Sequence, residues 1–266
     1  METEQLSLKM IVTDLDGTLL RDDKTVSDRT WSALSRCRER GIKVVFATGR
    51  GLSATIVPFS PFDGYVVNNG AKAFAGDVPV YSRVIPIDAA RNMLVSCDNA
   101  GIRIVAECDR HHYSNFDLPD DWPRLWKNRN TNFTELNIDA DKIYALIDTS
   151  ETVEFIKRCV PDMVYCSATR DGFVMVMHKE AIKSAAVASL ANHWNINRSE
   201  IIAFGDDLND IDLLEYSATG IAMGNAVCEV KMVADYVCDT NENDGLAKWL
   251  EDNLLNTTTS CGNCFT

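Results

Sequence analysis

The chain carries the stretch Lys9-Met-Ile-Val-Thr-Asp14-Leu-Asp16-Gly17-Thr-Leu19 close to its start. The apolar, β-branched run at 9–13 predicts a short buried strand, which ends where the sequence turns acidic. Two carboxylates one residue apart at a strand end can ligate a hard cation such as Mg²⁺. Alternatively, one can attack as a nucleophile while the other transfers protons. Gly17 would let the backbone turn sharply past both. Because such acidic pairs are common in loops, this motif alone leaves its function open.

A second acidic cluster, Gly205-Asp206-Asp207-Leu-Asn209-Asp210, follows another predicted strand at 200–204. Clustered carboxylates repel one another and raise one another's pKa unless a cation is present. A bound Mg²⁺ would relieve this repulsion. Ligands of open parallel sheets bind outside the carboxyl ends of the strands, so the two clusters are expected to converge there.

Two further motifs suit a phosphate group. Thr48-Gly49-Arg50 follows a predicted strand at 43–47, and a hydroxyl with free backbone N–H groups at a helix start can cradle phosphate. Lys183 begins a predicted helix and could balance charge as a point cation, although by itself it is more simply a solvated helix lysine.

The stretch Gly49-Arg-Gly-Leu-Ser-Ala54 also matches the dinucleotide fingerprint G-x-G-x-x-A. That fingerprint needs an acidic residue at the end of the next strand. The next strand ends in Asn68-Asn69 instead, so a dinucleotide site is not expected.

The order of the predicted elements indicates two kinds of domain. Strands and helices alternate up to residue 81 and again from residue 181, which is typical of a parallel sheet with helical crossovers. Between them, strands separated by helices and hairpins predict a small α+β unit with an antiparallel sheet. We therefore expect an α/β core formed by residues 1–81 and 181–266, with an inserted domain at 82–180.

Composition limits the possible partners. The 266 residues carry a formal net charge of −13, which disfavours nucleic acid and anionic lipid as partners. No apolar run approaches the roughly 20 residues that span a bilayer, and the start lacks a signal-peptide core. We expect a cytoplasmic protein without an obligate protein partner. Cys261-Gly-Asn-Cys264 is a single cysteine pair, so it does not by itself predict a zinc site.

Taken together and in this order, the motifs closely resemble the haloacid dehalogenase superfamily of phosphohydrolases, in its Cof-type subfamily with a type IIB (C2B) cap domain. One local departure is Glu180-Ala-Ile182 before the lysine, where relatives usually carry Gly-Val-Ser/Asp. The motifs that carry the resemblance are Asp14-Leu-Asp-Gly-Thr-Leu19, Thr48-Gly-Arg50, Asn69-Gly-Ala71, Lys183, Gly205-Asp-Asp-Leu-Asn-Asp210 and Ala222-Met-Gly-Asn-Ala226.

The resemblance implies a Rossmann-like core and a division of roles among the motif residues. The implied catalytic residues are Asp14, Asp16 and Lys183. Asp14 would be the nucleophile that forms an aspartyl-phosphate, and Asp16 would act as the general acid and then the general base. Arg50 would brace its loop with a salt bridge. The implied Mg²⁺ ligands are the Asp14 carboxylate, the Asp16 main-chain carbonyl and Asp206, with Asp210 orienting bound waters. The implied phosphate-binding groups are Asp14, Thr48, the Gly49 N–H, Lys183 and Asn209.

The inserted domain would close over the site and recognise the rest of the substrate. Candidate contacts are Arg170, Asp171 and His178. The stretch Cys108-Asp-Arg-His-His112 is expected to be a surface loop rather than a soft-metal site, because its potential ligands are too crowded to converge.

The sequence therefore predicts a Mg²⁺-dependent phosphatase acting on small phosphorylated metabolites, chiefly sugar phosphates. Two alternatives stay open: a phosphomutase of the same superfamily and a non-catalytic phosphometabolite sensor.

Overall fold

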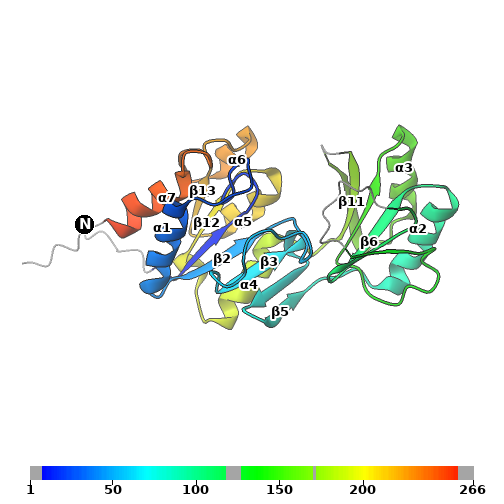
Figure 1. The fold of residues 1–266 in the computed structure, drawn as a ribbon, viewed down its shortest axis with the longest axis horizontal. Helices are drawn as coiled ribbons and strands as arrows, with labels where there is room; N and C mark the ends of the chain where they lie inside the picture. Colours follow the sequence, from blue (N-terminus) through cyan, green and yellow to red (C-terminus); the bar gives the residue numbers. More distant parts are fainter. Residues whose placement is uncertain (1–7, 118–126, 170–171, 257–266) are drawn as a thin grey trace, which may run out of the picture. The chain divides into compact units, whose positions relative to one another are not determined.

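The computed structural model describes residues 8–117, 127–169 and 172–256 (Figure 1). Contacts between residues divide the chain into two compact units. Unit 1 comprises the segments Met1–Phe46, Pro61–Asp63 and Ile196–Thr266, and unit 2 comprises Ala47–Ser60 and Gly64–Asn195.

Unit 1 contains a parallel sheet in which an interior strand leads into the first acidic motif. All four residues of β1 (Met10–Thr13) are buried, as expected for a parallel strand covered on both faces. Strand β1 pairs with β12 in the register Met10↔Ile201 and with β2 in the register Met10↔Lys43. The strands lie in the order β14 (Tyr236–Val237), β13 (Thr219–Ala222), β12 (Ile201–Gly205), β1 and β2 (Lys43–Ala47).

Helices cover this sheet in the βαβ manner that the sequence predicts. Helix α1 (Asp28–Glu39) begins at Ser27, whose hydroxyl oxygen accepts a hydrogen bond from the Thr30 N–H at 3.1 Å. It packs against α7 (Gly245–Leu250), while α5 (Ile211–Tyr216) packs against β12 and β13. The remaining helical elements are η2 (Arg198–Glu200), η3 (Leu208–Asp210), α6 (Cys228–Val233) and the π-helical turn η4 (Glu251–Leu255).

Unit 2 begins with the loop after β2 and continues into an antiparallel meander. Strands β3 (Gly64–Val67), β4 (Lys72–Ala75) and β5 (Val78–Ser82) pair in sequence order, and α4 (Lys183–His193) packs against all three. The 3₁₀ turn η1 (Asn68–Gly70) joins β3 to β4.

The rest of unit 2 is a six-stranded sheet with helices α2 (Ile87–Asn99) and α3 (Ser150–Cys159). These two helices pack against each other, α2 against β6 and α3 against β10 (Figure 1). All strand pairs are antiparallel except β7 with β8. The strand order is β10 (Val164–Ala168), β11 (Phe173–His178), β9 (Lys142–Leu146), β6 (Ile104–Cys108), β7 (His111–Ser114) and β8 (Lys127–Asn130).

The predicted α/β class, with its parallel sheet and an α+β part, is confirmed. The six-stranded sheet lies within residues 82–180. The boundaries of the inserted domain at 82 and 180 stay a prediction. The expectation that 108–112 forms a surface loop is wrong: Cys108 ends β6 and His112 lies in β7, and both side chains are buried. Asp109, with φ +54°, makes the turn that brings His112 opposite Glu107 in the sheet.

Among the described residues, the structure has no helix that is both long and apolar enough to span a membrane.

Candidate active site

The first acidic motif continues directly from β1. The Asp14 N–H donates to the Phe204 carbonyl at 3.0 Å, so the backbone stays paired with β12 one residue beyond the strand. The chain then folds back, because the Leu19 N–H donates to the Asp14 carbonyl at 3.3 Å and Gly17 adopts φ +78°. This turn holds the Asp14 side chain at the carboxyl end of β1, where it is buried.

Three carboxylates converge at this point. Asp14, Asp206 and Asp210 each offer one oxygen, and these oxygens lie within 4.8 Å of one another. Asp14 and Asp210 are buried and Asp206 is half-buried. Carboxylates this close in a poorly hydrated place repel one another, and hard cations such as Mg²⁺ prefer oxygen ligands of this kind. The donor set therefore fits a divalent hard cation.

Hydrogen bonds fix two of these carboxylates in place. The Thr18 hydroxyl donates to Asp206 Oδ1 at 2.7 Å. Asp210 Oδ2 accepts from the backbone N–H groups of Asp206, at 3.0 Å, and Asp207, at 3.2 Å. Asp210 thereby holds the backbone of the second motif.

Two glycines make room for the cluster. A Cβ at Gly17 would lie 2.3 Å from Asp206 Oδ2, and one at Gly205 would lie 2.5 Å from Asp210 Cβ. Real Cβ atoms do not approach other atoms this closely, so any side chain at either position displaces a carboxylate.

Asp16 stands apart from the three converging carboxylates. Its side chain is 37% exposed and forms an ion pair with Lys24, with Nζ and Oδ1 2.9 Å apart. A group that donates and accepts a substrate proton has to reach solvent and the leaving group, and this exposure suits it.

Lys24 and Asn225 make contacts near the site that the sequence does not predict. Asn225 Nδ2 donates to the Gly17 carbonyl at 2.7 Å, and Asn225 Oδ1 accepts from the Asn241 N–H at 3.0 Å. Asn225 belongs to the motif Ala222–Ala226 that carries the family resemblance. Its hydrogen bond to the Gly17 carbonyl joins two loops that are remote in sequence and meet only in the fold.

The Thr48 loop belongs to unit 2. The Thr48 N–H donates to the Val66 carbonyl, the Asn69 N–H donates to the Thr48 carbonyl, both at 2.9 Å, and the Arg50 N–H donates to Thr48 Oγ1 at 3.1 Å. Arg50 Nη1 donates to the Ala54 carbonyl at 3.0 Å, a bond within the loop to a backbone oxygen; the expected salt bridge stays a prediction.

The turn at the end of β3 supports the same loop. Asn68 and Asn69 adopt φ values of +50° and +51°, a left-handed conformation that asparagine tolerates better than most residues. A Cβ at Gly49 would lie 2.9 Å from Asn69 Oδ1, so the Asn69 amide lies against the Gly49 backbone.

The other predicted residues fall in different places. Lys183 is the first residue of α4 in unit 2 and is 1% exposed, which rules out a solvated helix lysine. Asn209 lies exposed in η3 of unit 1. His178 ends β11 and its Nδ1 accepts from the Glu180 N–H at 3.1 Å. Arg170 and Asp171 lie outside the described residues, as do Cys261 and Cys264.

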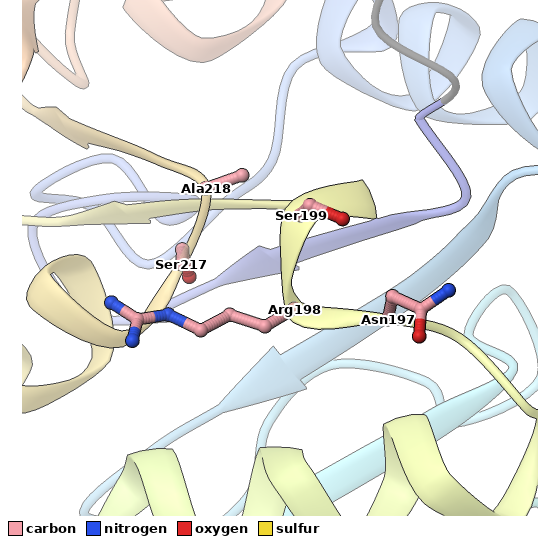
Figure 2. Close-up of a pocket in the computed structure, with 5 residues that line it drawn as sticks. All are labelled: Asn197, Arg198, Ser199, Ser217 and Ala218. Atoms are coloured by element: carbon pink, nitrogen blue, oxygen red, sulfur yellow. The ribbon is translucent and has the colours of Figure 1, made fainter.

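A hollow lies at the amino ends of β12 and β13, the ends opposite the acidic cluster. It is lined by Asn197, Arg198, Ser199, Ser217 and Ala218, which precede β12 and β13 (Figure 2). The Arg198 guanidinium donates to the carbonyls of Tyr216 and Glu215, the latter at 2.6 Å. These bonds tie two loops together at the amino ends of the sheet, away from the carboxylates.

Comparison with known proteins agrees with this geometry. A family model described as haloacid dehalogenase-like hydrolase matches residues 11–250. The Bacillus subtilis protein 5-amino-6-(5-phospho-D-ribitylamino)uracil phosphatase YitU is 28% identical over 263 residues, which cover 91% of this chain and 96% of that protein.

Solved structures give the same result. TM0651 from Thermotoga maritima is 26% identical, with a TM-score of 0.83, and the match covers 92% of this chain and 97% of the TM0651 chain. BT4131, a sugar phosphatase of HAD subclass IIB, is 26% identical with a TM-score of 0.77 and covers 92% of this chain and 98% of its own. The chain therefore belongs to the haloacid dehalogenase-like hydrolases and is an enzyme of the phosphatase kind within that superfamily.

Proposed function

We propose that this protein is a Mg²⁺-dependent phosphatase that hydrolyses small phosphorylated metabolites, sugar phosphates first among them, through an aspartyl-phosphate. The observation that carries the proposal is the convergence of Asp14, Asp206 and Asp210 at the carboxyl end of β1. The sugar phosphatase BT4131 and the ribitylaminouracil phosphatase YitU support a substrate with a phosphorylated polyol or sugar part.

In the first step, a carboxylate oxygen of Asp14 forms a bond to phosphorus as the bond from phosphorus to the leaving alkoxide breaks. Asp16, protonated, gives its proton to that alkoxide. A cation held by Asp14, the Asp16 carbonyl and Asp206 would offset the repulsion between the attacking carboxylate and the phosphate dianion.

In the second step, Asp16 takes a proton from a water molecule, which attacks the phosphorus of the aspartyl-phosphate. The bond from phosphorus to Asp14 breaks, inorganic phosphate leaves, and both carboxyl groups return to their starting states. We assign the phosphoryl oxygens to Thr48, the Gly49 N–H, Lys183 and Asn209. Asp210 keeps the second acidic motif in shape, and the inserted domain, with His178, Arg170 and Asp171 as candidates, recognises the rest of the substrate.

Phosphate release from a panel of phosphorylated sugars, nucleotides and cofactors tests the proposal, with Asp14→Asn as the matched blank. Release by the wild type in Mg²⁺, lost in excess chelator and in Asp14→Asn, is the expected result. The ranking of substrates identifies the class. Turnover in Asp14→Asn above a few per cent of the wild-type rate would overturn the nucleophile assignment. Restoration of chelated enzyme by Zn²⁺ alone would overturn the assignment of a hard cation.

A phosphomutase and a phosphometabolite sensor are the alternatives, and the same panel separates them. A phosphomutase would move the phosphoryl group to a second hydroxyl without net phosphate release. A sensor would bind phosphate in Mg²⁺ without turnover of any substrate.

A further inference from the structure

A buried row of ionisable side chains crosses the six-stranded sheet of unit 2. Glu107 of β6 stands directly opposite Lys142 of β9 and His112 of β7 in the strand registers. Lys142 Nζ lies 3.2 Å from Glu107 Oε2 and His112 Nε2 lies 3.6 Å from it. The Glu107 side chain is 2% exposed and that of Lys142 is 10% exposed. No step of the proposed reaction uses either residue.

Both members of the ion pair touch the Thr48 loop. Lys142 Nζ donates to the Gly49 carbonyl at 3.3 Å. A Cβ at Gly51 would lie 1.5 Å from Glu107 Oε1, so the carboxylate rests directly against the Gly51 backbone. Asn68 Nδ2 also lies 3.5 Å from Glu107 Oε1. The pair therefore contacts the loop at two residues that follow Thr48.

The contact at Gly49 controls how the next peptide points. The Gly49–Arg50 peptide is trans, so its carbonyl and its N–H point in opposite directions. With the carbonyl held by Lys142, the Arg50 N–H is directed at Thr48 Oγ1, which it reaches at 3.1 Å. A hydroxyl oxygen that accepts this bond keeps its own hydrogen available for donation.

A stability role alone does not account for the pair. Replacing a buried ion pair by apolar residues of similar volume is often neutral or stabilising, because removing two charges from water is costly. The Lys142–Glu107 pair supplies a fixed hydrogen-bond donor, Lys142 Nζ, for the Gly49 carbonyl. An apolar pair would not supply one.

We propose that Lys142 and Glu107 are positioning residues for phosphate binding. They fix the Gly49–Arg50 peptide so that the Thr48 hydroxyl is presented as a hydrogen-bond donor to a phosphoryl oxygen. This inference rests on the proposed function, which assigns Thr48 and Gly49 to the phosphate.

Lys142→Met tests the inference, with Lys72→Met as its matched control. Lys72 of β4 is also a largely buried lysine of unit 2, with a 17% exposed side chain, and its Nζ pairs with Asp141 at 2.7 Å and with Asp109. Neither partner belongs to the Thr48 loop. The dissociation constant of inorganic phosphate, measured by calorimetry in Mg²⁺, is compared with KM, kcat and the melting temperature.

We expect Lys142→Met to weaken phosphate binding and raise KM by about tenfold, with a smaller fall in kcat, because one directed hydrogen bond to the loop is lost. Lys142→Arg, which keeps a charged donor, should recover at least part of the loss. Lys72→Met should lower the melting temperature while leaving the phosphate dissociation constant within about twofold of wild type. Equal weakening of phosphate binding in both Met variants, or unchanged binding in Lys142→Met, would overturn the inference.

Gly51→Ala keeps the test decisive if Lys142→Met does not fold. The added methyl group displaces the Glu107 carboxylate without changing any charge, and it should weaken phosphate binding as Lys142→Met does. Normal phosphate binding by Gly51→Ala would count against the positioning role.

The binding measurement also separates this inference from the proposed function. If wild type turns over no substrate but Lys142→Met still weakens phosphate binding, the phosphatase proposal fails and the positioning role stands. If wild type releases phosphate and both Met variants behave alike, only the positioning role fails. A wild type that binds no phosphate at all would overturn the positioning role as well.

Discussion

At the scale of single residues, the acidic cluster depends on positions without a side chain. Gly17 combines φ +78° with a Cβ direction that points at Asp206 Oδ2. Gly17→Ala should therefore strain the backbone and displace a carboxylate, and we expect kcat to fall by about a hundredfold, since misplacement by an ångström can cost this much.

Gly41→Ala is the control for Gly17→Ala. Gly41 has a similar φ of +82°, but a Cβ there would meet nothing within 4 Å. The two variants should lose comparable stability in thermal melts, whereas only Gly17→Ala should lose activity per folded molecule. Comparable activity losses would show that backbone strain, and not the carboxylate, is responsible.

The Glu107 carboxylate gives the fold a predictable pH dependence. Burial alone would raise its pKa, but Lys142 and His112 outweigh burial and lower the pKa from 4.5 to about 2. A carboxyl group with a lowered native pKa stabilises the fold above its unfolded pKa, and this contribution is lost as pH falls from about 4.5 towards 2.

Glu107→Gln should therefore lower the free energy of unfolding at pH 7 by on the order of 3 kcal/mol, at 1.36 kcal/mol per pKa unit. The deficit should shrink at pH 3, and urea denaturation at both pH values measures it. Glu154→Gln breaks the exposed pair of Glu154 with Lys157 and should change stability by less than about 1 kcal/mol at either pH. A Glu107→Gln deficit that is the same at pH 3 and pH 7 would contradict this account.

At the scale of elements, the short helical turn η3 holds the second acidic motif through one side chain. Asp210 Oδ2 accepts from two backbone N–H groups, so Asp210→Ala leaves both without their acceptor. Unmade hydrogen bonds of this kind cost about 1–3 kcal/mol each. We expect Asp210→Ala to lose about 2 kcal/mol of stability and most of its activity.

Asp207→Ala provides the comparison for Asp210→Ala within the same turn. Asp207 is exposed, and its side chain accepts from the backbone N–H groups of Leu208, at 2.9 Å, and of Asp210. Loss of such a cap costs about 1 kcal/mol. Phosphate release by Asp207→Ala should stay near the wild-type rate. If the two variants lost activity equally, the turn as a whole and not the Asp210 carboxylate would carry the effect.

The sequence predicted well those elements whose pattern of apolar and polar residues matches their burial in the fold. Strands β1 and β12 read as continuous apolar runs because they are buried at every position. Strand β7 was missed because His111 and His112 look polar in sequence. His112 is buried and stands opposite Glu107 across a turn at Asp109 that the sequence did not signal.

At the scale of the whole molecule, the sequence predicted the motifs but not the contacts that hold them. Asp14, Asp206 and Asp210 could be expected to meet, because parallel strands deliver their carboxyl ends to one edge. The roles of Asn225 and Lys142 could not be predicted, because each acts through a partner that is remote in sequence, the Gly17 carbonyl for one and the Gly49 carbonyl for the other.

The net charge of the whole chain opposes the binding of a phosphate group. A protein with a net charge of −13 repels a phosphate dianion at long range, so attraction has to be local. The buried Lys183 and a cation between the carboxylates would supply it in the proposed mechanism.

Trapping the phosphoryl group on Asp14 tests the central claim most directly. An aryl phosphate with a good leaving group needs little help from an acid, so Asp16→Asn should still transfer its phosphoryl group but hydrolyse the intermediate slowly. Acid quenching followed by peptide mass mapping should find one phosphoryl group per chain, on the peptide that contains Asp14, and none in Asp14→Asn. A phosphoryl group on any other residue, or phosphate release from Asp16→Asn at the wild-type rate with unmodified Asp14, would contradict the account.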